Sequence, residues 1–162
     1  MSDKIWLGID PGLAITGWAI LKSRTKLTPT IVDYGVIQTS KNLSTSQRLL
    51  EIEHDLLKLL SEFNFHGISI EMPFFNRTIK AAGGVIQAVG VINLVCYRET
   101  QIEPVFLHQA SWKRHVGSGK ATKNDVTRSI SQLFHLKTIP IDDSVDAIAI
   151  AYAGLSGLTN NI

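Results

Sequence analysis

Apolar and polar positions change their spacing several times along the chain. Short apolar runs bounded by turn residues predict strands over residues 4–10, 15–22, 30–39, 67–71 and 102–108. Apolar positions at helical spacing predict helices over residues 44–64, 77–99, 123–136 and 142–155. Three hairpin-linked strands followed by strand–helix alternation predict an α/β protein of order β-β-β-α-β-α-β-α-α, with a five-stranded mixed sheet and helices on both faces.

Length and composition narrow the class of protein. At 162 residues, 44% hydrophobic and 19% charged, the chain is expected to form a single domain over residues 1–162. The single cysteine, Cys96, excludes a disulfide framework, and its apolar context predicts a core residue. No stretch reaches the roughly 18 apolar residues of a membrane span, so we expect no membrane association and a cytoplasmic location.

Positive charge is concentrated in one segment, although the formal net charge is only +2. Between His108 and Lys137 the chain has a single acid, Asp125. The basic residues of this block are Lys113, Arg114, Lys120, Lys123, Arg128 and Lys137. Such a block is typical of a surface that binds a polyanion, although a solvated loop and helix face produce the same pattern.

Acidic residues occur at strand ends and at one helix start. Asp10 ends the first predicted strand and Glu71 ends the fourth. In the segment "IPIDDSVDAIAIAYAG", Asp146 shares a helix face with Asp143 or Asp142, because residues three or four apart lie on the same side. An acid at a helix start is also an ordinary cap, and an aspartate before Pro-Gly is ordinary turn chemistry.

These carboxylates are expected to meet in one pocket, because ligand sites in a mixed sheet gather at strand ends and helix starts. A set of carboxylates without His or Cys suits Mg²⁺ or Mn²⁺ and does not suit structural zinc. Two such ions would activate a water and stabilise the leaving oxygen of a phosphodiester. Together with the basic block, the acids indicate a metal-dependent nuclease.

Five segments together resemble the motifs of the RuvC family of Holliday junction resolvases. In chain order they are LGIDPGLAITGWAIL, ISIEMPFF, AAGGVIQAVGVI, WKRHVGSGKATKNDV and DDSVDAIAIAYA, and they span nearly the whole chain. The resemblance implies an RNase H-like fold, a homodimer and divalent-metal cleavage of four-way DNA junctions by paired symmetrical nicks that leave 5′-phosphates. It also suggests a branch-migration helicase as a partner, and a place at the nucleoid in a bacterium or in the host cytoplasm for a phage protein.

The resemblance also implies roles for individual residues. The catalytic, metal-binding carboxylates would be Asp10, Glu71, Asp143 and Asp146, with Asp142 as the helix cap. Lys113 would join them as a catalytic lysine. The family has a second important lysine, which matches Lys123; the stretch between the two is one residue shorter here, so Lys120 is the alternative.

DNA contacts are implied for aromatic and basic residues around these motifs. Phe74 matches an aromatic that stacks on a base at the opened junction, and Phe75 lies beside it in the sequence. The full set of implied DNA-binding residues is Phe74, Phe75, Arg77, Lys80, Lys113, Arg114, Lys120 and Lys123.

The Gly- and Ala-rich helix predicted over residues 77–99 is the candidate for dimer contact, particularly around Gly83–Gly90. Small residues at Ala81, Gly84, Ala88 and Val91 predict a flat face. That face would pack either against a second subunit or against the sheet.

Other functions share parts of this pattern. The segment "DPGLAITGW" imitates the phosphate-cradling hairpin of actin-like and sugar-kinase ATPases, which need two such lobes. A pre-rRNA-processing nuclease of the same fold would keep the acids and act on RNA, but the basic block argues against it. A broader nuclease for forks and three-way junctions, and a protein that binds junctions without cutting them, both remain alternatives.

Overall fold

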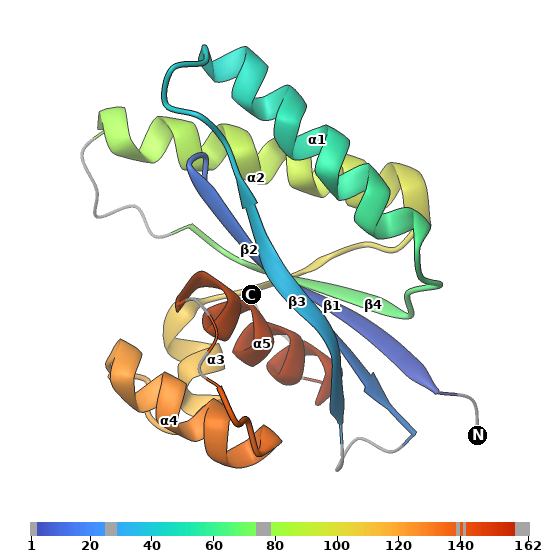
Figure 1. Ribbon diagram of the computed structural model, residues 1–162, viewed down its shortest axis with the longest axis vertical. Helices are drawn as coiled ribbons and strands as arrows, with labels where there is room; N and C mark the ends of the chain where they lie inside the picture. Colours follow the sequence, from blue (N-terminus) through green and yellow to red (C-terminus); the bar gives the residue numbers. More distant parts are fainter. Residues whose placement is uncertain (1–2, 25–28, 74–78, 139, 141, 158–162) are drawn as a thin grey trace.

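The computed structural model describes residues 3–24, 29–73, 79–138, 140 and 142–157 (Figure 1). Its elements are β1 (Lys4–Asp10), β2 (Ile15–Ser23), β3 (Thr30–Gln38), α1 (Thr45–Ser61), β4 (Gly67–Glu71), α2 (Ile79–Thr100), β5 (Val105–Leu107), α3 (Gln109–Val116), α4 (Lys123–Phe134) and α5 (Asp142–Leu155). The predicted order is confirmed with one addition, the short helix α3. The predicted strand over residues 102–108 is reduced to the three residues of β5.

The sheet is mixed, as predicted. Its strand order is β3-β2-β1-β4-β5, with β1–β2 and β2–β3 antiparallel and β1–β4 and β4–β5 parallel. In the parallel pair β1–β4, Ile9 lies opposite Ile70, so the carboxyl ends of these strands meet at one edge of the sheet. Asp10 and Glu71, the next residues, therefore lie side by side.

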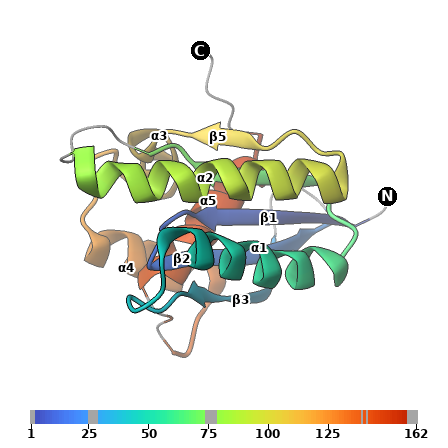
Figure 2. The same cartoon turned by 90° about the horizontal axis from the view of Figure 1, so that it is seen from above.

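Helices cover both faces of the sheet (Figures 1 and 2). On one face α1 and α2 enclose a core that contains Leu7, Ile9 and Ile20. On the other face α5 packs directly on β1 and β2, with α3 and α4 outside it, around a second core that contains Trp112 and Ile148.

Two glycines let α5 approach the sheet closely. A Cβ on Gly8 would collide with the backbone of Ala147, and one on Gly17 would collide with the carbonyl of Asp143. Gly17 lies opposite Asp10 in the β1–β2 ladder. The absence of a side chain at this position therefore brings the start of α5 next to the end of β1.

The small-residue face of α2 packs on the sheet, which decides between the two predicted alternatives for that face. A Cβ on Gly84 would lie 2.9 Å from Leu13 Cδ2, Ala88 is fully buried and Val91 packs against the core. The side chain of Ala81 lies outside the described residues. By contrast, a Cβ on Gly83 or Gly90 would meet nothing within 4 Å.

Cys96 is a core residue, as predicted. It is fully buried on α2, and this burial raises the pKa of its thiol to about 12. The thiol therefore stays protonated at neutral pH and packs as a small apolar group.

No helix in the part of the chain that the structure describes is long and apolar enough to cross a membrane.

Candidate active site

The predicted carboxylates come from three elements that converge at one end of the sheet. Asp10 ends β1 and Glu71 ends β4, while Asp143 and Asp146 lie one turn apart at the start of α5. All four are partly buried. Asp142 is the first residue of α5, but its side chain lies outside the described residues.

Asp10 lies at the electrostatic centre of this group. Burial raises the pKa of its carboxyl well above the usual value, and the negative charges of Glu71, Asp146 and Asp143 raise it further. The positive charge of Lys123 opposes these effects. The group therefore disfavours the negative charge on Asp10 and would be stabilised by a cation.

The donor set fits a hard divalent cation, because all four candidate ligands offer carboxylate oxygens. Within the described residues, no three His, Cys, Asp or Glu side chains lie close enough to hold one ion together. The negative charges of Glu71, Asp143 and Asp146 nevertheless all raise the pKa of Asp10.

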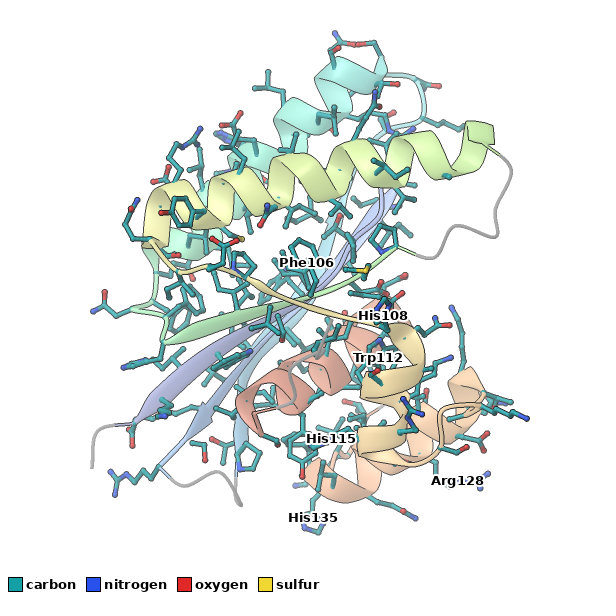
Figure 3. The ribbon with its side chains drawn as sticks, turned by 180° about the vertical axis from the view of Figure 1, so that it is seen from behind. Phe106, His108, Trp112, His115, Arg128 and His135 are labelled. Carbon is teal, nitrogen blue, oxygen red and sulfur yellow. The ribbon has the colours of Figure 1, made fainter. Side chains whose placement is uncertain are left out.

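Glu71 is held by Trp112, a residue outside the predicted site. Trp112 lies on α3 (Figure 3), and its indole Nε1 donates a hydrogen bond to Glu71 Oε2 at 2.7 Å. The ammonium of Lys113 lies over the same indole, 5.7 Å from the ring centroid. The available signal was the Trp-Lys pair itself, at the start of the motif "WKRHVGSGKATKNDV".

The basic block begins on α3 and continues into α4. Arg114, Lys120 and Lys123 are exposed, and Lys113 is partly buried. The single acid of the block, Asp125, has a structural role: its Oδ2 accepts hydrogen bonds from the backbone N–H and the hydroxyl of Thr122, at 2.9 and 2.7 Å. This capping box begins α4 and fixes Lys123 as its first residue.

The other predicted DNA contacts fall on a part of the chain that is not described. Phe74, Phe75 and Arg77 lie outside the described residues, as does the side chain of Lys80. The structure therefore leaves these four predictions untested.

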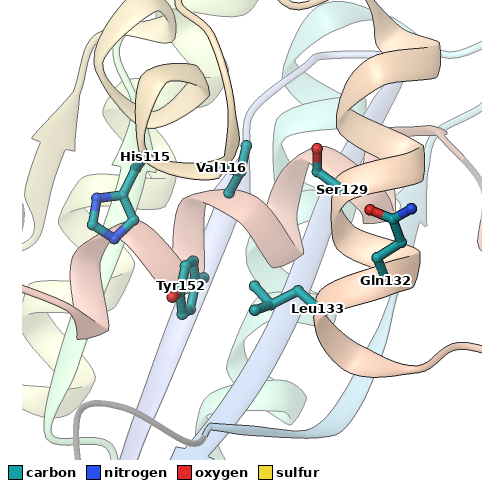
Figure 4. Close-up of a pocket in the computed structure, with 6 residues that line it drawn as sticks. All are labelled: His115, Val116, Ser129, Gln132, Leu133 and Tyr152. Carbon is teal, nitrogen blue, oxygen red and sulfur yellow. The ribbon is translucent and has the colours of Figure 1, made fainter.

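A separate hollow of about 400 Å³ lies among α3, α4 and α5 (Figure 4). It is lined by His115, Val116, Ser129, Gln132, Leu133 and Tyr152. Tyr152 lies about 14 Å further along α5 than Asp143, at about 1.5 Å per residue. None of the candidate carboxylates lines this hollow, so it is distinct from the candidate active site.

Solved structures show which class of protein has this fold. A structure of Thermus thermophilus RuvC matches this chain with a TM-score of 0.81 and 26% identity. The matched region makes up 94% of this chain and 93% of the T. thermophilus chain. The yeast mitochondrial Holliday junction resolvase Ydc2 matches with a TM-score of 0.62 and 16% identity, over 93% of this chain and 78% of the Ydc2 chain. The fold is therefore the RNase H-like fold of the Holliday junction resolvases.

Sequence comparison then identifies the family. The family model described as crossover junction endodeoxyribonuclease RuvC matches residues 6–153. A curated RuvC from Synechocystis sp. is 64% identical over 157 residues, which make up 97% of this chain and 94% of the relative. The chain belongs to the RuvC family of crossover junction endodeoxyribonucleases, which decides against the ATPase and pre-rRNA alternatives.

Proposed function

We propose that this chain resolves four-way DNA junctions by paired symmetrical nicks in DNA recombination and repair. The observation that supports this most strongly is the electrostatic group around Asp10, formed by carboxylates of β1, β4 and α5. Three negative charges gathered around the buried Asp10 carboxyl favour a bound cation, which cleavage of a phosphodiester needs and DNA binding alone does not. Family membership supports the same proposal, and a solved T. thermophilus RuvC complex contains a Holliday junction substrate.

In this proposal Asp10, Glu71, Asp143 and Asp146 hold Mg²⁺ or Mn²⁺, with two ions at each site. The bound cations would lower the pKa of a water and stabilise charge on the phosphodiester. Asp10 and Asp146 orient the water that attacks phosphorus in line with the leaving 3′-oxygen, which leaves a 5′-phosphate. Lys113 stabilises the negative charge that grows on the phosphoryl oxygens.

We further propose a homodimer that uses the exposed face of α2. Ile86, Gly90, Leu94 and Tyr97 follow one another at helical spacing, and the three apolar side chains are 43%, 62% and 46% exposed. Contiguous exposed apolar residues of this kind mark interaction surfaces. A second copy is the occupant that suits a two-fold substrate cut at two symmetrical points. A helicase partner and a cytoplasmic location remain predictions.

The proposed function is tested by incubating the protein with a labelled synthetic four-way junction in Mg²⁺, Mn²⁺ or EDTA. We expect paired nicks in either metal and no cleavage in EDTA. Forks, three-way junctions and linear duplex serve as competitors, and Asp146→Asn serves as the inactive control. Equal cleavage of forks and three-way junctions would favour the broader nuclease, and tight binding without cleavage in either metal would favour the non-cleaving protein.

The roles of Lys123 and Lys120 can be distinguished by the pH dependence of cleavage and the salt dependence of junction binding. Burial is the main cause of the raised pKa of Asp10, and the positive charge of Lys123 lowers that pKa. Lys123→Ala should therefore raise the pKa of Asp10 further. Protons would then compete with the cation up to a higher pH. The cleavage rate of the variant should therefore increase at a higher pH than that of the wild-type protein. Lys120→Ala should leave the pH profile unchanged and reduce the salt slope of junction binding by about 1. The opposite outcome would make Lys120 the second lysine of the site.

A further inference from the structure

Trp112 is a buried aromatic residue in direct contact with two residues of the candidate active site. Its side chain is fully buried, and it is the largest such side chain among the described residues. The indole N–H donates to Glu71 at 2.7 Å, across 41 residues of sequence, and the face of the ring lies under the Lys113 ammonium. One side chain therefore contacts both a candidate metal ligand and the candidate catalytic lysine.

The fold fixes where this indole points. Glu71 on β4 lies opposite Leu107 on β5, and Met72 N donates to Leu107 O at 2.9 Å. The chain then turns at His108 into α3, where Trp112 N donates to His108 O at 3.2 Å. One helical turn after β5, the indole thus lies beside the end of β4 (Figure 3).

Packing holds the ring in that orientation. Trp112 belongs to the core formed with α5, whose members include Val145 and Ala149. A fully buried indole in a close-packed core cannot turn without displacing its neighbours. The direction of the N–H is therefore set before any cation or DNA binds.

The chemistry of the indole suits this position. Its N–H is only a donor, so it can hold an ionised carboxylate but cannot itself bind a cation. The bond engages the Oε2 atom of Glu71. The negative face of the ring attracts the Lys113 ammonium, so the same ring orients both groups.

We propose that Trp112 is a positioning residue that holds Glu71 and Lys113 in a fixed relation to each other, so that the carboxylate is oriented before the cation binds. This inference rests on the proposed function, because it assigns Glu71 to cation binding. Groups that orient metal ligands typically change metal affinity by about 10- to 100-fold when removed. The effect of Trp112 should therefore appear mainly in the cation requirement.

The chain contains a matched control for this idea. Trp6 also donates an indole hydrogen bond inside the protein, to Ser69 Oγ at 3.0 Å, and Ser69 Oγ donates to the carbonyl of Ile150 at 2.8 Å. Trp6→Phe removes an indole N–H and ring volume just as Trp112→Phe does. It does not touch a carboxylate of the site.

Trp112→Phe should raise the Mg²⁺ concentration for half-maximal junction cleavage by about 10-fold or more, with cleavage largely recovered at saturating Mg²⁺. Trp6→Phe should leave that concentration unchanged, even though both variants melt at a lower temperature. An unchanged Mg²⁺ requirement in Trp112→Phe would overturn the proposal, as would an equal increase in Trp6→Phe.

A second measurement uses the unmodified protein and does not depend on activity or on the folding of a variant. In a Mg²⁺ titration without DNA, followed by NMR of ¹⁵N-labelled protein, the indole resonance of Trp112 should shift while that of Trp6 stays in place. If the backbone amides of Asp10 and Asp143 shift but the Trp112 indole does not, the positioning role fails and the metal site survives. If no resonance responds to Mg²⁺, the positioning role and the proposed metal site both fail.

Discussion

Asp10→Asn is expected to abolish junction cleavage and, in the absence of divalent cation, to raise the melting temperature of the protein. Cleavage should fall by roughly 10³-fold, because the variant loses a charge that the transition state requires. The gain in stability follows from the surroundings of Asp10: burial and three neighbouring carboxylates disfavour its ionised form. A gain of about 1 kcal/mol would raise the melting temperature by about 2–4 °C.

The pH dependence of this difference has a definite sign. The pKa of the Asp10 carboxyl is near the ordinary 3.8 in the unfolded chain and is higher in the folded protein. Between these two pKa values the folded state binds more protons, so the free energy of unfolding falls as the pH rises. Asp10→Asn has no ionisable group at this position, so its free energy of unfolding does not fall for this reason. The two proteins should therefore be equally stable below about pH 4, and their difference should grow as the pH rises through this window.

Mg²⁺ should reverse the order of stability. Cation binding raises the free energy of unfolding of the wild-type protein by RT ln(1 + [Mg²⁺]/Kd). The variant gains less, because it has lost one of the ligands. Thermal unfolding with and without Mg²⁺, at several pH values, measures both effects. Asp55→Asn is the control, because Asp55 is an exposed residue on α1 and its loss should change stability by less than about 0.5 kcal/mol. A lower melting temperature of metal-free Asp10→Asn at neutral pH would contradict the repulsive cluster.

The strands that position the site were predictable because their boundaries are local. The predicted bounds of β1 and β4 match the structure, since each is an apolar run that ends in an acid and is followed by a proline within two residues. β5 is shorter than predicted because only residues 105–107 pair with β4. Pro104, just before it, has no N–H to give to a ladder. The helix α3 was missed because eight residues, three of them basic, give too short an apolar pattern.

Contacts between distant segments were less predictable. The acids could be selected from strand ends and motif resemblance, but the choice of Asp143 over Asp142 came from the resemblance alone. The bond between Trp112 and Glu71 depends on where α3 begins after β5, beside the end of β4, and no local pattern encodes this. The side of α2 that faces the core was also not predictable, because apolar and small residues occur all around the helix and form no single apolar stripe. Only packing showed that Gly84 faces Leu13 while Leu94 remains exposed.

Leu94→Asp is expected to convert the proposed dimer into a monomer and to uncouple the two nicks. Leu94 is 62% exposed, so in a monomer the change should alter stability by less than about 0.5 kcal/mol. In a two-fold interface the substitution occurs twice and buries two like charges, each at a cost of several kcal/mol. The dimer dissociation constant should therefore rise by more than about 10³-fold, since each 1.4 kcal/mol is about tenfold.

Sedimentation equilibrium measures the dissociation constant, and a junction labelled on two opposing strands reports whether both are cut in one binding event. Leu133→Asp provides the control, because Leu133 is 43% exposed on α4, away from α2. It should leave dimerisation unchanged. If Leu94→Asp dimerises as the wild-type protein does, the interface lies elsewhere, and the exposed face of α2 serves another partner. If it is monomeric and still makes paired nicks, cleavage at the two sites is coupled through the junction and not through the dimer.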